Sequence, residues 1–90
     1  MLALPPELTH RQARATLQQL LAALAAAPGE QACVDAHALR VFDSSALAVL
    51  LECRRAALAA GRRFAVRGLP PALAGVAGLY GVQDLIQAPG

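Results

Sequence analysis

The sequence predicts a single small α/β domain over residues 1–90, with a mixed sheet of about four strands and about three helices packed on it. Short apolar segments alternate with longer segments of helical periodicity, which is typical of helices packed on a largely parallel sheet. Ninety residues suffice for one hydrophobic core and not for two. The chain contains neither GxGxxG nor a P-loop motif, so a doubly wound nucleotide-binding fold is not indicated.

The first half of the chain predicts an edge strand, a helix and a buried strand. Leu2–Leu4 can form a short strand, which the two prolines that follow would end and confine to the sheet edge. Thr9 and Gln12 have the spacing of a helix-capping box, and four leucines at the spacing of one helical face follow them. A helix is therefore expected over about residues 11–27. Gln31–Ala36 is apolar at its centre, as expected of a buried strand.

The second half predicts two more helices and another central strand. Val41 and Phe42 lead into Asp43-Ser44-Ser45, three good N-cap residues, so a second helix should begin there and end near a glycine at position 61. Phe64–Val66 predicts a strand, and Pro71–Leu79 predicts a helix with proline in its first turn. Residues 82–86 could form a last strand or a short helix, after a glycine at 81 suited to a left-handed helix end.

The apolar spacing within the second helix predicts which side chains face the core. The core side is expected to hold Leu47, Leu50, Leu51, Ala57 and Leu58, and the outer side Glu52, Arg55, Ala59 and Arg62.

Composition and charge limit the possible partners. The formal net charge is only +2, and the eight Lys and Arg positions are all arginine. So small a net charge favours solubility rather than binding of a polyanion. Nucleic-acid binding is not expected, because Phe42, Phe64 and Tyr80 are too few aromatic residues for a stacking surface.

The longest apolar run, Leu20–Ala27, is far below the roughly 20 residues of a membrane span, so no direct membrane insertion is expected. The first residues lack the features of a secretory signal, which predicts a cytoplasmic protein.

The cysteines and histidines predict no cofactor and no metal. Cys33 and Cys53 are too few for a disulfide framework and too far apart for a CxxC pair, so both are expected to be buried and reduced. His10 and His37 form no recognisable metal-binding spacing with them.

Asp43-Ser44-Ser45 is the candidate functional site, and three interpretations are open. The cluster could only satisfy the free amides at the start of the second helix. A serine hydroxyl there could also bind a partner or carry a phosphate, since the helix start stabilises added negative charge, although Asp43 would repel a phosphoserine at close range. A catalytic serine is disfavoured, because the GxSxG elbow is absent. An enzyme is therefore not expected.

The stretch from Val34 to Ile86 resembles the STAS domain, a family that includes the bacterial anti-anti-sigma factors and the small MlaB-type subunit of phospholipid-transport ABC complexes. Three segments carry the resemblance: the strand that ends at Asp35, the run Val41–Leu51, and the closing Leu79–Ile86. The middle segment is the most diagnostic, because it opens a helix directly after a strand.

The resemblance implies a non-catalytic cytoplasmic subunit, peripheral to the inner membrane through its partner. That partner would be the ATPase subunit (MlaF-like) of an Mla-type phospholipid transporter, which maintains outer-membrane lipid asymmetry, and through the ATPase the permease. Asp43, Ser44, Ser45 and Leu47 would lie at or near the ATPase contact. The alternative is an anti-anti-sigma factor, phosphorylated on Ser45, or else on Ser44, by an anti-sigma serine kinase. Ala46 replaces the glycine of the Asp-Ser-Ser-Gly-Leu motif, which favours the lipid-transport branch.

Overall fold

The computed structural model describes residues 2–26 and 29–86. In chain order its elements are β1 (Leu2–Ala3), β2 (Glu7–Leu8), α1 (Ala13–Ala26), β3 (Gln31–Asp35), β4 (Val41–Phe42), α2 (Ser44–Ala59), β5 (Arg63–Arg67), α3 (Pro71–Leu79) and α4 (Gln83–Ile86). Strands and helices alternate along the chain, which confirms the predicted α/β class. No helix in the described part of the chain is long and apolar enough to cross a membrane.

The described strands pair in two separate sheets. One has the order β1-β3-β5, so Val34 at its centre lies opposite Leu2 on one side and Val66 on the other. The second is a two-stranded ladder of β2 and β4, in which Leu8 lies opposite Phe42. A mixed sheet of about four strands was expected, whereas the described residues form five strands and all their pairings are parallel. The predicted edge position of β1 is confirmed.

The small β2–β4 sheet was not predicted, and the prolines between β1 and β2 explain why. Pro5 and Pro6 have no backbone N–H, which ends a strand that must donate hydrogen bonds. The carbonyl oxygen of Pro6 still accepts hydrogen bonds, from the backbone N–H groups of Arg40 at 2.8 Å and Val41 at 3.0 Å. These bonds draw the segment after the prolines onto β4, directly before α2.

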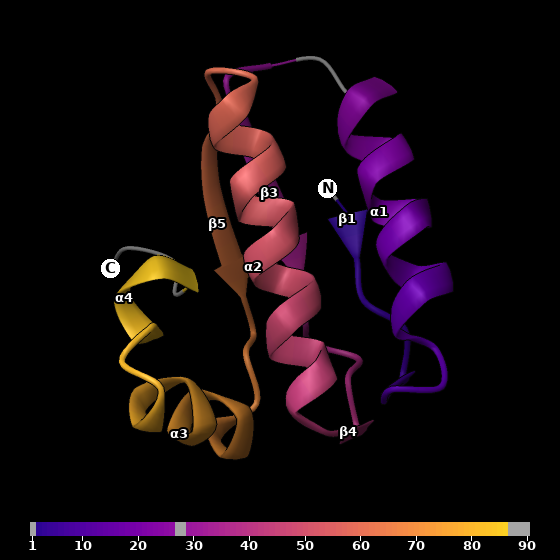
Figure 1. Cartoon of the computed structure of the whole chain (residues 1–90), viewed down its shortest axis with the longest axis vertical. Helices are drawn as coiled ribbons and strands as arrows, with labels where there is room; N and C mark the ends of the chain where they lie inside the picture. The colour runs from indigo at the N-terminus through magenta and orange to yellow at the C-terminus, as the bar shows by residue number, and fades with distance from the viewer. Residues whose placement is uncertain (1, 27–28, 87–90) are drawn as a thin grey trace.

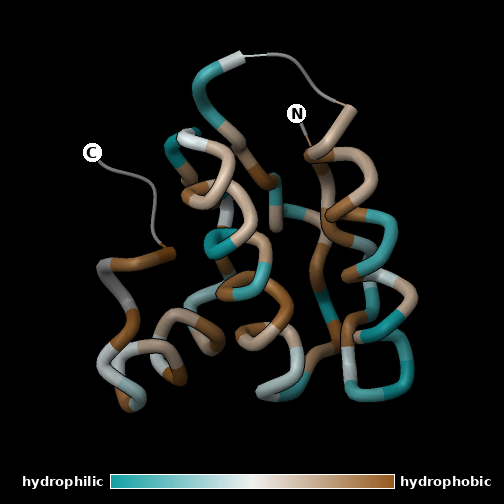
Figure 2. The backbone as a smooth tube through the Cα atoms, turned by 45° about the horizontal axis from the view of Figure 1, so that its top comes forward, coloured by the Kyte–Doolittle hydropathy of each residue, from teal (hydrophilic) through white to brown (hydrophobic). Residues whose placement is uncertain are grey.

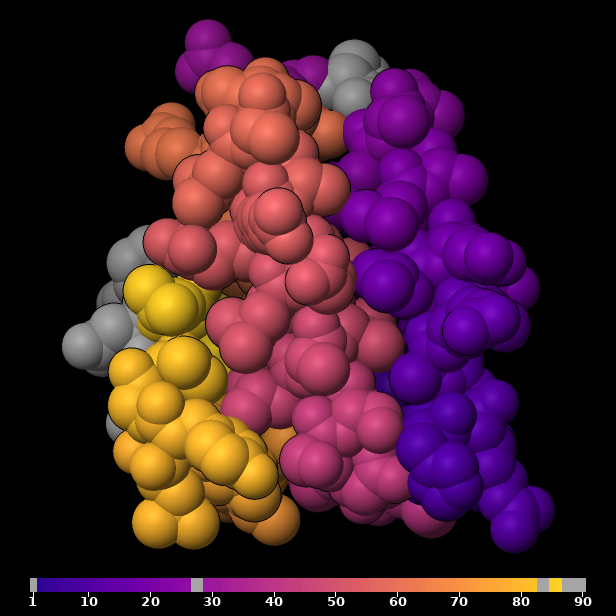
Figure 3. All heavy atoms as spheres, in the orientation of Figure 1, coloured from indigo at the N-terminus to yellow at the C-terminus, as the bar shows by residue number. Residues whose placement is uncertain are grey.

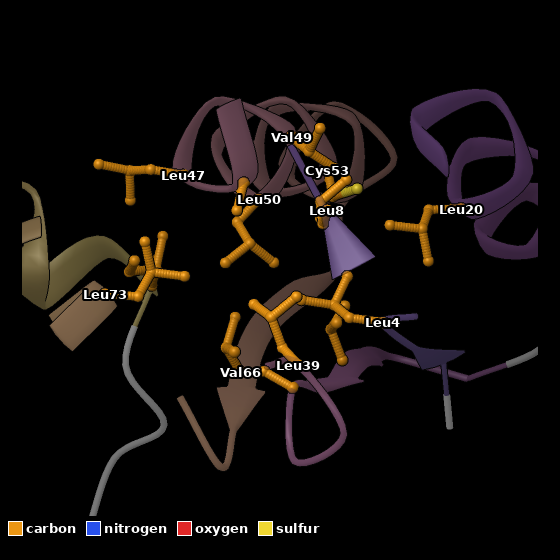
Figure 4. Close-up of a cluster of buried hydrophobic side chains, with 14 of the residues drawn as sticks. Leu4, Leu8, Leu20, Leu39, Leu47, Val49, Leu50, Cys53, Val66 and Leu73 are labelled. Atoms are coloured by element: carbon orange, nitrogen blue, oxygen red, sulfur yellow. The ribbon is translucent and has the colours of Figure 1, made fainter. Parts of the chain in front are cut away.

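Helices α1 and α2 cover one face of the three-stranded sheet, α4 lies beside β5, and α3 lies beyond the carboxyl end of that strand (Figure 1). Because strand side chains alternate between faces, Ala32 and Val34 of β3 point toward the helices and are buried. Side chains from α2, α3, β5 and the loops meet in one core beneath α2 (Figure 4). The largest side chains that are less than 2 % exposed are Leu8, Val34, Leu50, Cys53, Leu73 and Ile86.

Three predictions about burial were wrong or only partly right. Leu58 is 47 % exposed, because Ala57 takes the core position in the last turns of α2. Arg62 is half-buried rather than outside, and its Nη1 donates to the carbonyl oxygen of Leu24 at 2.7 Å, near the end of α1. The burial of Cys53 is confirmed, but Cys33 is only half-buried, because its place between Ala32 and Val34 in β3 directs it to the other face of the sheet.

The helix ends follow their predicted signals. Gly61, with φ of +73°, allows the N–H of Arg62 to return to the carbonyl oxygen of Ala57 at 2.9 Å after α2. Gly81, with φ of +70°, has the predicted left-handed conformation, and the chain then forms α4 rather than a strand. The predicted bounds of α3, Pro71–Leu79, are confirmed.

Candidate functional site

Asp43 begins α2 as its N-cap residue. Its backbone is extended, with φ of −132° and ψ of −168°, and its Oδ1 accepts a hydrogen bond from the N–H of Ser45 at 2.8 Å. This bond satisfies one of the free amides of the first helical turn. The capping interpretation of Asp43 is thereby confirmed.

His10 is the residue at this site that sequence reasoning missed. Its backbone N–H donates to Oδ2 of Asp43 at 3.0 Å, and its ring Nδ1 lies 3.3 Å from the same oxygen. The contact joins residues 33 positions apart. It depends on β2, because the pairing of Leu8 with Phe42 brings the segment after β2 to the start of α2. Because the sequence gives no signal for β2, it gives none for the contact between His10 and Asp43.

The turn around His10 is held by its own side-chain hydrogen bonds. Oε1 of Gln12 accepts from both the N–H and the hydroxyl of Thr9, at 2.9 Å and 2.8 Å. Nε2 of Gln12 donates to a carboxylate oxygen of Glu7 at 2.5 Å, and the hydroxyl oxygen of Thr9 accepts from the N–H of Arg11 at 3.3 Å. One half of the predicted capping box is thereby confirmed, the hydrogen bond from the N–H of Thr9 to the side chain of Gln12. These bonds hold His10 in place beside Asp43.

The hydrogen bonds around Asp43 also determine its charge. The backbone N–H of His10, then the N–H of Ser45, lower the pKa of the Asp43 carboxyl from its ordinary 3.8 to about 2. The carboxylate is 40 % exposed and is ionised at neutral pH. Each of its oxygens already accepts a hydrogen bond within the chain, so its first role is to organise the turn and the helix start.

The other predicted site residues differ in their access to solvent. Ser44 is exposed, whereas Ser45 is half-buried. Leu47 is only 3 % exposed, so a partner could contact only a small part of its side chain. The structure thus brings Asp43, Ser44 and Ser45 together at the surface and places Leu47 one turn further along α2, on its core side.

An apolar groove adjoins Ser44. It has a volume of about 390 Å³ and is lined by Ser44, Leu47, Ala48, Leu51 and Tyr80. It lies between α2 and the end of α3, two elements that are side by side on the face shown in Figure 3. Sequence reasoning did not assign Tyr80 to a site, although its segment was part of the family resemblance.

The segment that supplies Tyr80 to this groove is unusually apolar for a surface. Leu79 is 87 % exposed and Tyr80 is 66 % exposed. Residues 71–82 contain no charged side chain, and Figure 2 shows no strongly hydrophilic position along this part of the tube. The groove, with the exposed ring of Tyr80, can bind a partner's apolar side chains, and Ser44 is a polar group in its lining.

No group of three or more His, Cys, Asp or Glu residues in the described part of the chain could hold a metal ion. Burial raises the pKa of the Cys53 thiol to about 11, so this thiol is protonated at neutral pH and is a poor nucleophile.

Comparison with known proteins identifies the family. A model described as the MlaB STAS domain matches residues 1–87, which is nearly the whole chain. No curated protein matches the chain. STAS domains are generally non-catalytic. The chain therefore belongs to the family of MlaB-type STAS domains.

Proposed function

We propose that this chain is a non-catalytic cytoplasmic subunit that binds and supports the ATPase subunit of an Mla-type phospholipid-transport ABC complex. It would be peripheral to the inner membrane through that ATPase. The contact would use one docking face, which we define as His10, Asp43, Ser44, Ser45 and the adjoining groove as far as Tyr80. Membership of the MlaB-type family supports the class of partner.

The observation that carries this proposal is the apolar groove beside the exposed Ser44. Apolar surface in contact with water costs about 25 cal/mol per Å², and contiguous exposed apolar surface is typical of protein interfaces. Tyr80 lines the groove and presents such surface there, and tyrosine is among the residues enriched in interfaces. Ser44 adds a hydroxyl at the rim, where hydrogen bonds of an interface are usually made.

The geometry of Ser45 makes the anti-anti-sigma alternative less favourable. Ser45 is half-buried, and its N–H already donates to Oδ1 of Asp43 at 2.8 Å. A phosphate on Ser45 would lie near a carboxylate that is ionised at neutral pH, and the two negative charges would repel each other. Phosphorylation there would disturb the cap of α2. Ser44, which is exposed, is the more accessible of the two hydroxyls.

The proposal is tested by co-expressing the chain with the ABC ATPase of the same genome and measuring the affinity of the purified pair. Replacing Ser44 with glutamate should weaken binding by about tenfold or more, which corresponds to ~1.4 kcal/mol. The variant should fold, because an acidic residue in the first turn of a helix is favourable.

The matched control is Ala59→Glu, which adds the same charge to an exposed position at the other end of α2. It should leave the affinity unchanged. Equal effects of the two variants would remove Ser44 from the contact. Capture of an anti-sigma kinase in place of the ATPase, with a phosphate on Ser45 detected by mass spectrometry, would support the alternative instead.

A further inference from the structure

The ring of His10 is both exposed and fixed. Its side chain is 75 % exposed, yet its backbone N–H and its Nδ1 lie 3.0 Å and 3.3 Å from Oδ2 of Asp43. The hydrogen bonds among Glu7, Thr9 and Gln12 hold the turn that carries it. An exposed histidine ring usually rotates freely, whereas this one is held at the start of α2.

The carboxylate determines which ring nitrogen carries the proton. A neutral imidazole has one N–H, and the hydrogen bond of one nitrogen sets the protonation of the other. An unprotonated Nδ1 would place its lone pair against the ionised carboxylate of Asp43, which is repulsive. The carboxylate therefore favours the neutral form of His10 that carries its proton on Nδ1, which leaves Nε2 as a hydrogen-bond acceptor.

Nε2 is then available on the docking face. The ring contacts Asp43, the residue that directly precedes the exposed Ser44 at the start of α2. Ser44 has a hydroxyl that can donate or accept, whereas both oxygens of Asp43 already accept bonds within the chain. His10 adds an acceptor of fixed position to this face.

We propose that His10 is a specificity-determining residue of the docking face. Asp43 holds its ring in the Nδ1–H form, and Nε2 accepts a hydrogen bond from a neutral donor of the partner protein, such as a hydroxyl or an amide. The identity of the partner as the ATPase subunit rests on the proposed function. The tautomer and the orientation of the ring belong to the isolated chain and do not rest on it.

The tautomer is tested on the isolated domain by the ¹⁵N chemical shifts of the imidazole nitrogens, at a pH where the ring is neutral. The wild-type chain should show the Nδ1–H form of His10. The variant Asp43→Ser keeps a good N-cap residue, but the serine side chain is too short to reach His10. The ring of His10 should then change to the Nε2–H form that histidine prefers in water. An Nε2–H ring in the wild-type chain would overturn the proposal.

The recognition is tested by two substitutions of His10 in the complex with the ATPase. Asparagine keeps an amide N–H where Nδ1 stands but has no atom at the position of Nε2, whereas glutamine reaches that position with a polar group. His10→Asn should weaken the affinity by about threefold to tenfold, the effect of one lost hydrogen bond, and His10→Gln should recover most of it.

The outcomes separate this inference from the proposed function. Unchanged binding by His10→Asn, in a complex that Ser44→Glu weakens, would overturn the role of His10 and leave the proposed function standing. Absence of any complex between the wild-type chain and the ATPase would refute the proposed function and the recognition by His10 together. The ¹⁵N measurement would still decide the tautomer.

Discussion

At the scale of single residues, Asp43 connects two parts of the chain that are distant in sequence. One oxygen caps α2 through the N–H of Ser45, and the other receives His10 from the turn after β2. A residue that caps its own helix is visible in the sequence, because the partner is two positions away. A bond to a residue 33 positions away is visible only after the chain has folded.

The lowered pKa of Asp43 predicts how stability changes with pH. The folded-state pKa, about 2, is below the ordinary value of 3.8, so the ionised carboxylate favours the folded state. This contribution is fully present above about pH 4 and is lost as the pH falls from about 4 to about 2. Urea unfolding at a series of pH values should therefore show a falling free energy of unfolding in that window. Asp43→Asn, which keeps an acceptor but cannot ionise, should flatten this dependence. Equal slopes for both proteins would contradict the assignment.

At the scale of elements, β2 is the segment on which the site depends. It contains two residues, of which Leu8 is fully buried in the core. Its partner β4 is equally short and leads directly into the N-cap of α2. Strand propensity over two residues is too weak a signal to predict such a pairing, and the register appears only when the core holds Leu8 and the Pro6 carbonyl accepts its hydrogen bonds.

Replacing Leu8 with alanine should therefore affect both stability and the site. The lost apolar contacts and the cavity should lower the free energy of unfolding by about 2–5 kcal/mol, as measured by chemical denaturation. The backbone resonance of His10 should also move, because the turn after β2 loses its anchor. The matched control is Leu58→Ala, at a leucine that is 47 % exposed, and it should cost less than about 1 kcal/mol. A similar cost for both variants would contradict the core position of Leu8.

At the scale of the whole molecule, the docking face joins elements from both halves of the chain. The turn after β2 supplies His10, α2 supplies Ser44, and the end of α3 supplies Tyr80. Helix α2 packs against α1 and the core, and its outward side, with Glu52, Arg55 and Ala59, is exposed. The groove beside Ser44 lies where this outward side meets the end of α3 (Figures 1 and 3).

Tyr80 should be a main contributor to binding if this face meets the ATPase. Truncation of a tyrosine that is a hot spot of an interface commonly costs about 2 kcal/mol or more, which corresponds to roughly thirtyfold in affinity. Tyr80→Ala should lower the affinity by that factor in a titration with the ATPase. The variant domain should still fold, because the side chain of Tyr80 is 66 % exposed. Leu58→Ala removes exposed apolar surface outside the groove and should bind as the wild type does. Unaltered affinity of Tyr80→Ala would exclude the groove from the contact.

The sequence by itself determined the α/β class, the bounds of α3 and the start of α2 at Asp43, because each depends on periodicity, turn residues or caps within a few positions. It also indicated the family, through the resemblance of three segments to STAS domains. It did not determine β2, the exposure of Leu58, the hydrogen bond from Arg62 to α1, or the contact of His10 with Asp43. Those depend on which segments meet in space, and the tertiary structure decides this through shared burial and long-range hydrogen bonds. The cap at Asp43 was therefore predictable, whereas the docking face around it required the fold.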